Sequence, residues 1–429
     1  MKFLLYISLL TVFLGACRNK KITIVEEKYI DSLISKYSQP IVYETENEIQ
    51  FWKDRIDPKF PGISNELKYA GLVTKRFSLT GDIKDMQIAD SVLKQININY
   101  NSRESSPFLA LMHNAITQHR FVEADSFLQQ AKRIGIKQYE TQTGTFDVDF
   151  ESGRYFQAEK ALNKIIAGND YGYYFRKAKL AHYKGDIDTS ISAMKRAVDI
   201  SRNNIALKQA SLSNLADLYL HSGHLQKAYD LYKESINLSS ADLHSIMGIG
   251  WIALVHDKNE VLAEKIFQFV STKTKAPDAL YKLMYVAESR KDTMAQKKYA
   301  TEFRDRVSDP AYGNMYNKYL IELYTGILNE PAKAESIASN ELHNRATPQT
   351  YAWYAWSLFS NNKKAEALTA YQNNISGKPL EGLELYWMGK LMQGENKMYT
   401  AKEYFKAANE NKYDLGPAMQ NDIEKNLEK

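Results

Sequence analysis

The sequence predicts an all-α protein, a solenoid of stacked helical hairpins, and three observations carry this prediction. Apolar residues recur at helical spacing on both sides of a short turn, most clearly across residues 210–238. The residue that ends the first helix there, Gly223, has counterparts at intervals of 34, 32, 38, 35, 33, 38, 33 and 34 residues along the chain. A small residue early in the second helix, Ala228, repeats in parallel with it.

The two series stay in phase through nine units, which is the mark of a repeat protein. The turn residues are His119, Gly153, Gly185, Gly223, Lys258, Lys291, Asn329, Asn362 and Asn396. The small positions are Ala124, Ala158, Ser190, Ala228, Ala263, Gln296, Ala334, Ala367 and Ala401. Gly and Asn, six of the nine turn residues, tolerate a left-handed backbone, and Ala lets two helices approach closely.

An irregular first unit precedes these nine. It covers about residues 67–96, with Gly81 as its turn and Ala89 as its small residue. The sequence therefore predicts about ten hairpins between residues 65 and 412. We expect residues 24–64 to form a helical cap over the first repeat, with a separate recognition element as the alternative, and residues 413–429 to form a C-terminal capping helix.

The repeat resembles the tetratricopeptide repeat (TPR). The family pattern is a large apolar residue, Leu-Gly, Tyr, a turn Gly, Ala, Phe or Tyr, and Ala. The last clear unit follows this pattern with Leu385, Met388, Gly389, Met392, Asn396, Ala401, Phe405 and Ala408. The resemblance implies that the first helix of each unit lines a concave surface, which in this family binds extended peptides or partner helices.

The N-terminus reads MKFLLYISLLTVFLGAC. Its apolar run is too short for a membrane-spanning helix, which needs roughly 20 residues. The segment ending at Cys17 resembles the bacterial lipoprotein box; an ordinary signal peptide or a buried helix is the alternative. The resemblance implies a signal peptide over residues 1–16, acylation (palmitate) of Cys17, and a tether over residues 17–23. Arg18, where an Asp would favour the inner membrane, favours the outer membrane, and we expect the periplasmic face.

The cysteine count, the net charge and the motifs that are missing exclude several classes of function. Cys17 is the only cysteine, which excludes a disulfide-stapled domain and thiol-based sites elsewhere in the chain. Without Lys2 the chain has 55 basic and 51 acidic residues, a net charge of +4, which does not suggest nucleic-acid binding. The sequence has no phosphate loop and no nucleophile elbow, and His221 and His224 lack the Glu of a HExxH motif. Asp147 and Asp149 form a pair that we expect to be solvated. We expect no enzyme activity, no metal and no cofactor.

Extending the helical phase along the array predicts which side chains face the concave surface. They form a strip rich in aromatic residues: Phe175, Lys179, His182, Tyr183, Ser213, Asp217, His221, Trp251, Tyr281, Tyr285, Tyr319, Trp356, Tyr386 and Lys390. Two interpretations stay open. The strip is either a binding groove, since Tyr and Trp are enriched at binding hot spots, or a set of aromatic residues that fills a tight superhelix from inside.

These observations favour a membrane-anchored scaffold or adaptor that binds protein or peptide partners through the concave aromatic groove. The alternative is a nutrient-binding lipoprotein similar to the SusD glycan receptors, which are lipidated and contain TPR-like helices. Those receptors carry long insertions between repeats, whereas the spacing here is nearly unbroken. We expect a protein or peptide partner, membrane contact through the lipid, and no nucleic acid; a glycan is the less favoured ligand.

The lipoprotein-box resemblance gives a direct test. Cys17→Ser removes the acylated side chain, and we expect the variant to leave the membrane fraction, because stable anchoring needs the acyl chains. Ultracentrifugation after a salt wash measures this, with wild type as the control. A variant that still pellets with membranes would contradict anchoring through Cys17.

Overall fold

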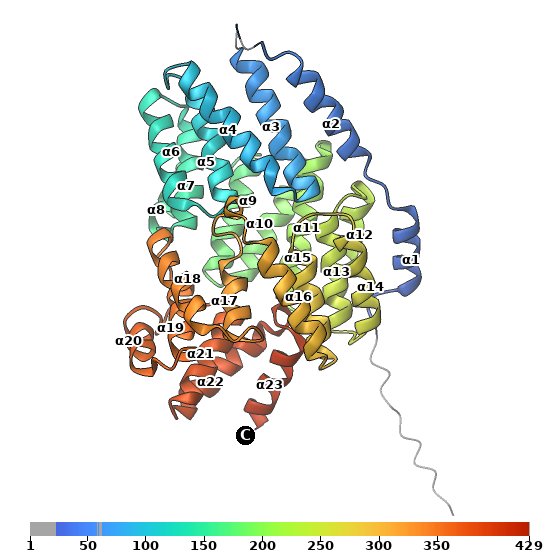
Figure 1. Cartoon of the computed structure of the whole chain (residues 1–429), viewed down its shortest axis with the longest axis vertical. Helices are drawn as coiled ribbons and strands as arrows, with labels where there is room; N and C mark the ends of the chain where they lie inside the picture. The colour runs from blue at the N-terminus through green and yellow to red at the C-terminus, as the bar shows by residue number, and fades with distance from the viewer. Residues whose placement is uncertain (1–22, 58, 60–61, 429) are drawn as a thin grey trace, which may run out of the picture.

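The computed structural model describes residues 23–57, 59 and 62–428, and helices without any strand make up this part of the chain. The predicted signal peptide, Cys17 and all of the tether but Thr23 lie outside the described residues. The predicted fold class is confirmed: the structure is an all-α solenoid (Figure 1).

The array contains ten hairpins of paired antiparallel helices, as many as the repeat spacing predicts. The first to the fifth are α3 (Ile63–Thr80) with α4 (Ile83–Asn99), α5 (Ser105–Thr117) with α6 (Phe121–Ile134), α7 (Gln138–Glu151) with α8 (Tyr155–Leu162), α9 (Tyr171–Tyr183) with α10 (Ile187–Ile200), and α11 (Ile205–His221) with α12 (Leu225–Leu238). The sixth to the tenth are α13 (Leu243–Val255) with α14 (Glu260–Ser271), α15 (Asp278–Ser289) with α16 (Thr293–Arg306), α17 (Asn317–Thr325) with α18 (Pro331–Asn344), α19 (Pro348–Ser360) with α20 (Lys364–Asn374), and α21 (Gly382–Gly394) with α22 (Met398–Glu410).

The turn inside each hairpin uses one left-handed residue. All nine predicted turn residues have φ between 51° and 80°, and so does Gly81, at 68°. In the fifth hairpin the amide of His224, which follows the turn residue, donates to the carbonyl of Tyr219 at 2.8 Å. This bond gives a partner to one of the last carbonyl groups of α11. Of the predicted small residues, Ala228 and its counterparts are buried; Gln296 is only half-buried.

The array winds so tightly that one superhelical turn rests on the next. The turns inside the early hairpins touch the loops that follow hairpins five places later. At the first hairpin the carbonyl of Thr80 accepts from the amide of Lys275 at 2.7 Å. At the second, the carbonyl of Gln118 accepts from the amide of Asn314 at 3.0 Å. We call this line of contacts the seam.

The seam continues along the array. The side chain of Asn344 accepts from the amide of Phe121 at 2.9 Å and donates to the carbonyl of His119 at 2.8 Å. At the third hairpin, Gly153 lies so close to Thr347 that a Cβ on it would come within 2.8 Å of the Thr347 methyl group. Figure 1 accordingly draws the hairpins from α3 to α8 directly above those from α17 to α22.

The two N-terminal helices lie in different places. α2 (Pro40–Lys53) packs against α3, the position that a cap over the first repeat requires. α1 (Glu27–Lys36) instead lies beside α14, in the middle of the array (Figure 1). Its Tyr29 ring meets the edge of Tyr229 on α12 at 6.2 Å between centroids. The segment 24–64 therefore covers the array at two separate sites.

The C-terminal helix α23 (Pro417–Glu428) packs on α22 and, because of the superhelical winding, also reaches α15. Leu415 and Ile423 are buried there. Gly416 approaches Tyr285 so closely that a Cβ on the glycine would lie 2.4 Å from the ring. The helix thus covers the last hairpin and also fills part of the concave side.

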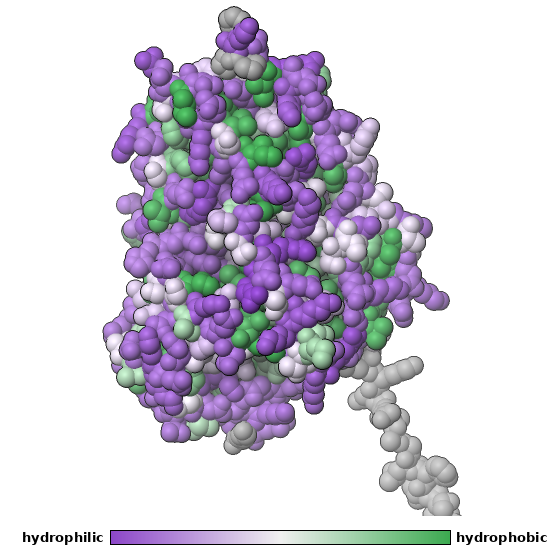
Figure 2. All heavy atoms as spheres, viewed as in Figure 1, coloured by the Kyte–Doolittle hydropathy of each residue, from purple (hydrophilic) through white to green (hydrophobic). Residues whose placement is uncertain are grey.

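The face drawn in Figure 2 is mostly hydrophilic, with apolar side chains in small, separate patches among charged and polar ones. None of the helices in the described part of the chain combines the length and the apolar character needed to cross a membrane.

The seam gives a testable stability prediction. Asn344→Ala leaves the amide of Phe121 and the carbonyl of His119 without these bonds, and we expect the free energy of unfolding to fall by about 1–3 kcal/mol. Denaturant unfolding followed by circular dichroism measures the change. Asn374→Ala is the matched control, because the amide of Asn374 donates within its own helix, to Ala370. Equal effects of the two substitutions would show that the seam bond contributes nothing.

Candidate functional site, the inner cavity

A cavity of about 730 Å³ lies on the inner side of the seam. The second to fifth hairpins supply one wall, and the chain from the loop before α17 to the residue after α22 supplies the other. Its lining combines aromatic, acidic and basic side chains: His119, Phe150, Glu151, Tyr155, Lys179, His182, Tyr183, Gly185, His221, Met315, Lys318, Tyr319, Arg345, Gln349, Trp353, Leu380, Glu381 and Glu384. We call it the inner cavity.

The inner cavity exists because the fourth hairpin does not close the seam. No described atom lies within 4 Å of a Cβ position built on Gly185, the turn residue of this hairpin. Gly185 is exposed and faces Pro379 and Glu381, in the loop before α21, across the cavity. On either side the turns of the third and fifth hairpins touch their partners, through Gly153 and His221. The gap leaves the cavity open between them.

Three aromatic rings form the wall that α7, α8 and α9 supply. Tyr155 and Tyr183 stack with their centroids 3.5 Å apart. Phe150 meets the edges of both rings, at 5.4 and 6.0 Å. Aromatic pairs contribute stabilisation in addition to that from the apolar area they bury, so these three rings form a rigid part of the lining.

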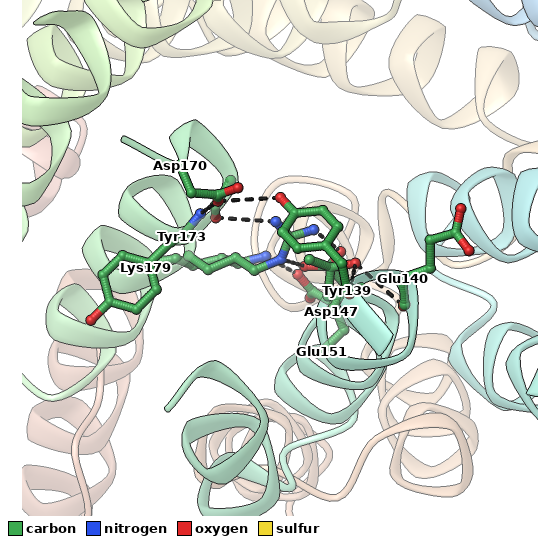
Figure 3. A network of polar contacts seen from close by, with 10 residues as sticks. Tyr139, Glu140, Asp147, Glu151, Asp170, Tyr173 and Lys179 are labelled. Atoms are coloured by element: carbon green, nitrogen blue, oxygen red, sulfur yellow. Dashed lines mark hydrogen bonds and ion pairs between the residues drawn. The ribbon is translucent and has the colours of Figure 1, made fainter. Parts of the chain in front are cut away.

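A network of charged and polar groups joins α7 to α9 beside this wall. Figure 3 shows the side chain of Lys179 running from α9 towards Glu151 and Asp147 of α7. Lys179 forms an ion pair with Glu151 and lies 4.8 Å from the ring centroid of Phe150. Burial alone would raise the pKa of Glu151, but the charge and hydrogen bond of Lys179 outweigh it, and the pKa is lowered. Glu151 therefore stays ionised inside the cavity.

The pair Asp147 and Asp149 is not a solvated face. Asp147 accepts two hydrogen bonds from the side chain of Arg176 on α9. The distance from Nε of Arg176 to the carboxylate of Asp147 is 2.9 Å. Asp149 accepts from Nε of Arg154 at 2.6 Å. The expectation of a solvated pair is therefore wrong, because each carboxylate lies within reach of an arginine on a neighbouring element. Asp147 thus joins the third hairpin to the fourth, whereas Asp149 holds Arg154 within the third hairpin, from where Arg154 also pairs with Asp125 of α6.

The opposite wall carries a buried lysine between two carboxylates. Nζ of Lys318 lies 3.0 Å from Glu384 and 3.4 Å from Glu381. Burial alone would lower the pKa of Lys318, but the two carboxylates outweigh it and raise the pKa. Glu384 is fully buried and also accepts from Nε1 of Trp353 at 2.7 Å, whereas Glu381 keeps 53 % of its side chain exposed. Glu381 is thus the carboxylate that a ligand can reach.

Three imidazoles border the inner cavity in different electrostatic states. His182 and His221 meet edge to face at 4.7 Å, and burial together with His221 lowers the pKa of His182. Burial would lower the pKa of His221 as well, but the bond to Asp414, at 2.5 Å, and its charge outweigh burial and raise it. Burial and the nearby Arg345 lower the pKa of His119 to about 4. In residues 23–57, 59 and 62–428, no three His, Cys, Asp or Glu side chains are grouped to hold a metal ion.

Five of the predicted groove residues meet at this cavity, namely Lys179, His182, Tyr183, His221 and Tyr319. Others lie against α23 and the loop before it. Nε1 of Trp251 donates to the carbonyl of Tyr413 at 2.7 Å. Tyr386 and Lys390 both bind Asp422, each at 2.9 Å. The C-terminal segment of the same chain therefore occupies this stretch of the strip.

The remaining predicted residues contact neighbouring helices of the array. The hydroxyls of Tyr281 and Tyr285 both donate to buried Glu322. Asp217 accepts from the hydroxyl of Tyr232 at 2.5 Å and pairs with His244 at 2.8 Å. Trp356 stacks on Trp387 and donates to Thr325, whereas Ser213 bonds to the carbonyl of Ala210 and Phe175 stacks on Tyr171 within their own helices. Much of the strip is therefore interior packing.

The sequence prediction missed the wall that the late repeats and loops supply, above all Lys318, Arg345, Trp353, Glu381 and Glu384. Lys318 directly precedes Tyr319, so a concave face widened by one position would have included it. The loop residues Arg345 and Glu381 have no periodic signal, because only the superhelical winding brings them to the cavity.

Searches against family models and against curated proteins find no match. Solved structures of low sequence identity do match. A tetratricopeptide repeat protein from Parabacteroides merdae is 16 % identical, with 61 % of this chain and 98 % of that one covered and a TM-score of 0.36. The human IFIT1 dimer with PPP-AAAA is 12 % identical, with 76 % of each chain covered and a TM-score of 0.47. The apo form of RapI is 13 % identical, with coverage of 68 % and 99 % and a TM-score of 0.37.

The chain has the fold of tetratricopeptide-repeat proteins. The recurrent hairpins with left-handed turns and a spacing near 34 residues establish this fold, and the similarity to these structures extends no further than the fold. What the inner cavity binds has to be argued from its own side chains.

The lowered pKa of His119 predicts acid sensitivity. The unfolded chain takes up a proton below an ordinary pKa near 6.5, whereas the folded chain does so only near pH 4, so stability falls as the pH drops through this window. This lowering of the pKa corresponds to roughly 3 kcal/mol. His119→Asn keeps a residue that tolerates positive φ and removes the titration. We expect its unfolding midpoint in urea to fall less between pH 7 and pH 4 than that of wild type. His343→Asn, on the surface, is the control and should behave as wild type; no difference between the two variants would contradict the assignment.

Proposed function

We propose that the protein is a membrane-anchored TPR-type scaffold that binds a segment of a protein or peptide partner in the inner cavity. The observation that carries the proposal is the gap in the seam at Gly185, which opens a lined cavity on the concave side of an otherwise closed array. Concave grooves of such repeats suit extended peptides and helices. The volume, about 730 Å³, lies in the range of ligand pockets.

The chemistry of the lining supports a peptide over a sugar. The cavity presents both signs of charge, with Lys179 and Lys318 beside Glu151 and Glu381. A peptide offers amides and charged side chains, so it can form charge-assisted hydrogen bonds of both signs with these groups, whereas a neutral sugar offers hydroxyl groups without a charge. The rings of Tyr155 and Tyr183 also stack on each other, which leaves less open ring surface for a sugar.

The same charge pattern argues against nucleic acid. Lys179, Lys318 and Arg345 each pair with a carboxylate of the chain, so a phosphate backbone would have to compete with these carboxylates. We propose binding without turnover and without a cofactor. PPP-AAAA, in the human IFIT1 structure, is a ligand of that protein.

We further propose that Cys17 carries the lipid and that the scaffold stands on the outer membrane, facing the periplasm. The lipoprotein-box resemblance of residues 14–17 and the absence of an Asp after Cys17 support this placement. A partner bound in the inner cavity would then be held at a fixed place relative to the membrane.

Filling the cavity tests the binding site. Met315 lines it and is half-buried, so Met315→Trp adds bulk where the ligand would lie. We expect the Cys17→Ser chain to bind members of a randomised heptapeptide array, and Met315→Trp to lower that binding by about tenfold or more, because the pocket loses ligand volume. Fluorescence of the labelled protein on the array measures binding.

Met398→Trp is the matched control, because Met398, at the start of α22, is 53 % exposed and does not line the cavity. Its peptide binding should equal that of wild type. A parallel glycan array tests the alternative function, that of a glycan receptor. If glycans bind and Met315→Trp abolishes that binding, the protein is a glycan receptor. Peptide binding that is indifferent to Met315→Trp would place the site elsewhere.

A further inference from the structure

The start of the described chain is fastened to the middle of the array. The amides of Ile24 and Val25 donate to the two carboxylate oxygens of Asp257, at 3.0 and 2.9 Å. The side chain of Asp257 is only 2 % exposed, so this bond lies inside the fold. Asp257 directly precedes Lys258, the left-handed turn residue of the sixth hairpin. The tether therefore leaves the protein at that turn.

Helix α1 reinforces the attachment along the same hairpin. Asp31 forms an ion pair with Lys265 of α14. The ring of Tyr37 meets the edge of Phe269, also on α14, at 5.0 Å. Because these contacts follow one another along α14, the segment from Ile24 to Tyr37 is held along its length, and Ile24 has a fixed place on the array.

Tether length limits how far a lipid on Cys17 can lie from this place. Ile24 lies seven positions after Cys17, and seven residue steps span at most about 25 Å. The turn at Asp257 must therefore lie within about that distance of the acyl chains. The surface next to this turn is the surface that the tether holds near the lipid.

The turn at Asp257 lies next to the end of the superhelix that the seam leaves uncovered. The turns of the first, second, third and fifth hairpins rest on later loops, and at the sixth Nζ of Lys258 donates to Gln420 of α23 at 2.8 Å, whereas the turns of the seventh to tenth, at Lys291, Asn329, Asn362 and Asn396, are exposed. We call the turns of the seventh to tenth hairpins, together with Val261 beside the sixth, the free end.

Large apolar side chains stand out from the free end. Val261, Met294 and Tyr399 each follow a turn residue by three positions and are 73 %, 86 % and 82 % exposed. Met398 beside Tyr399 is 53 % exposed. Exposed apolar residues also occur elsewhere, such as Phe156 at 73 %, so exposure alone does not single out this face. The attachment of the tether next to the free end distinguishes this face from the others.

We propose that the free end rests on the lipid surface, with Val261, Met294, Met398 and Tyr399 entering the headgroup region. This inference rests on the proposed lipidation of Cys17. Apolar side chains gain by insertion at the headgroup boundary, and Tyr suits this layer because its hydroxyl stays hydrated. Two lysines near these turns, Lys333 and Lys363, pair with Glu330 and Glu335, which reduces the charge that they offer to lipid.

The experiment imposes the tether chemically and asks which residues touch lipid. Residues 17–429, which retain every described residue, carry a single cysteine, so Cys17 can be coupled to a maleimide lipid in phosphatidylcholine vesicles. The photoreactive residue p-benzoylphenylalanine replaces Val261, Met294 or Tyr399, one at a time. Irradiation and mass spectrometry then measure the yield of lipid adduct on each chain.

Phe156 is the matched control, since it holds the same repeat position as Val261 and has the same exposed fraction, 73 %. A second control is Ile98, 68 % exposed near the end of α4. We expect about tenfold more lipid adduct at the three free-end positions than at the controls, since only inserted side chains stay in contact with lipid.

Equal adduct at Phe156 or Ile98 and at the free end would overturn the proposal. Crosslinks between two protein chains at Met294 in place of lipid adducts would overturn it too, and would make the free end an interface between copies. Because the lipid is attached chemically and the inner cavity plays no part, these outcomes are independent of whether cells acylate Cys17 and of what the cavity binds.

Discussion

The contact of one superhelical turn with the next is the constraint on which the rest of the structure depends. Each hairpin by itself buries only one face, and stacking continues that face into a core. The winding then brings the left-handed turns of the early hairpins onto the loops of the late ones, where main-chain and Asn344 hydrogen bonds join them. The seam closes the array into a compact body, and its gap at Gly185 creates the inner cavity.

The fold followed from local rules in the sequence. A left-handed turn residue at each unit set the register so firmly that His119, Lys258 and Lys291 were identified as turns although none is Gly or Asn. Helical phase also identified Lys179, Tyr183 and Tyr319 as inward-facing. Phase is a property of one helix, and a single unit contains all the information needed to predict it.

The winding could not be predicted in this way, because it is the sum of small angles between successive hairpins that no single residue determines. It decides that α23 covers Trp251 and Tyr386, and that loops bring Arg345 and Glu381 to the cavity. The position of α1 beside α14 has the same origin. Of the two interpretations of the aromatic strip, each applies to part of it: interior packing for Tyr281, Tyr285 and Trp356, and cavity lining for Lys179, His182, Tyr183, His221 and Tyr319. We propose that three parts of one chain have separate tasks: the seam holds the shape, the gap offers a binding site, and the free end faces the lipid.

Native-state hydrogen exchange at the seam tests this account most directly. The amides of Lys275, Asn314 and Phe121 lie outside the helical hydrogen-bond ladder or at its start, and each donates across the seam, to Thr80, Gln118 and Asn344. If the superhelix is closed in solution, these three amides exchange as slowly as amides inside the helices. Exchange at the rate of an unprotected loop would contradict a closed seam, and with it the inner cavity and the free end.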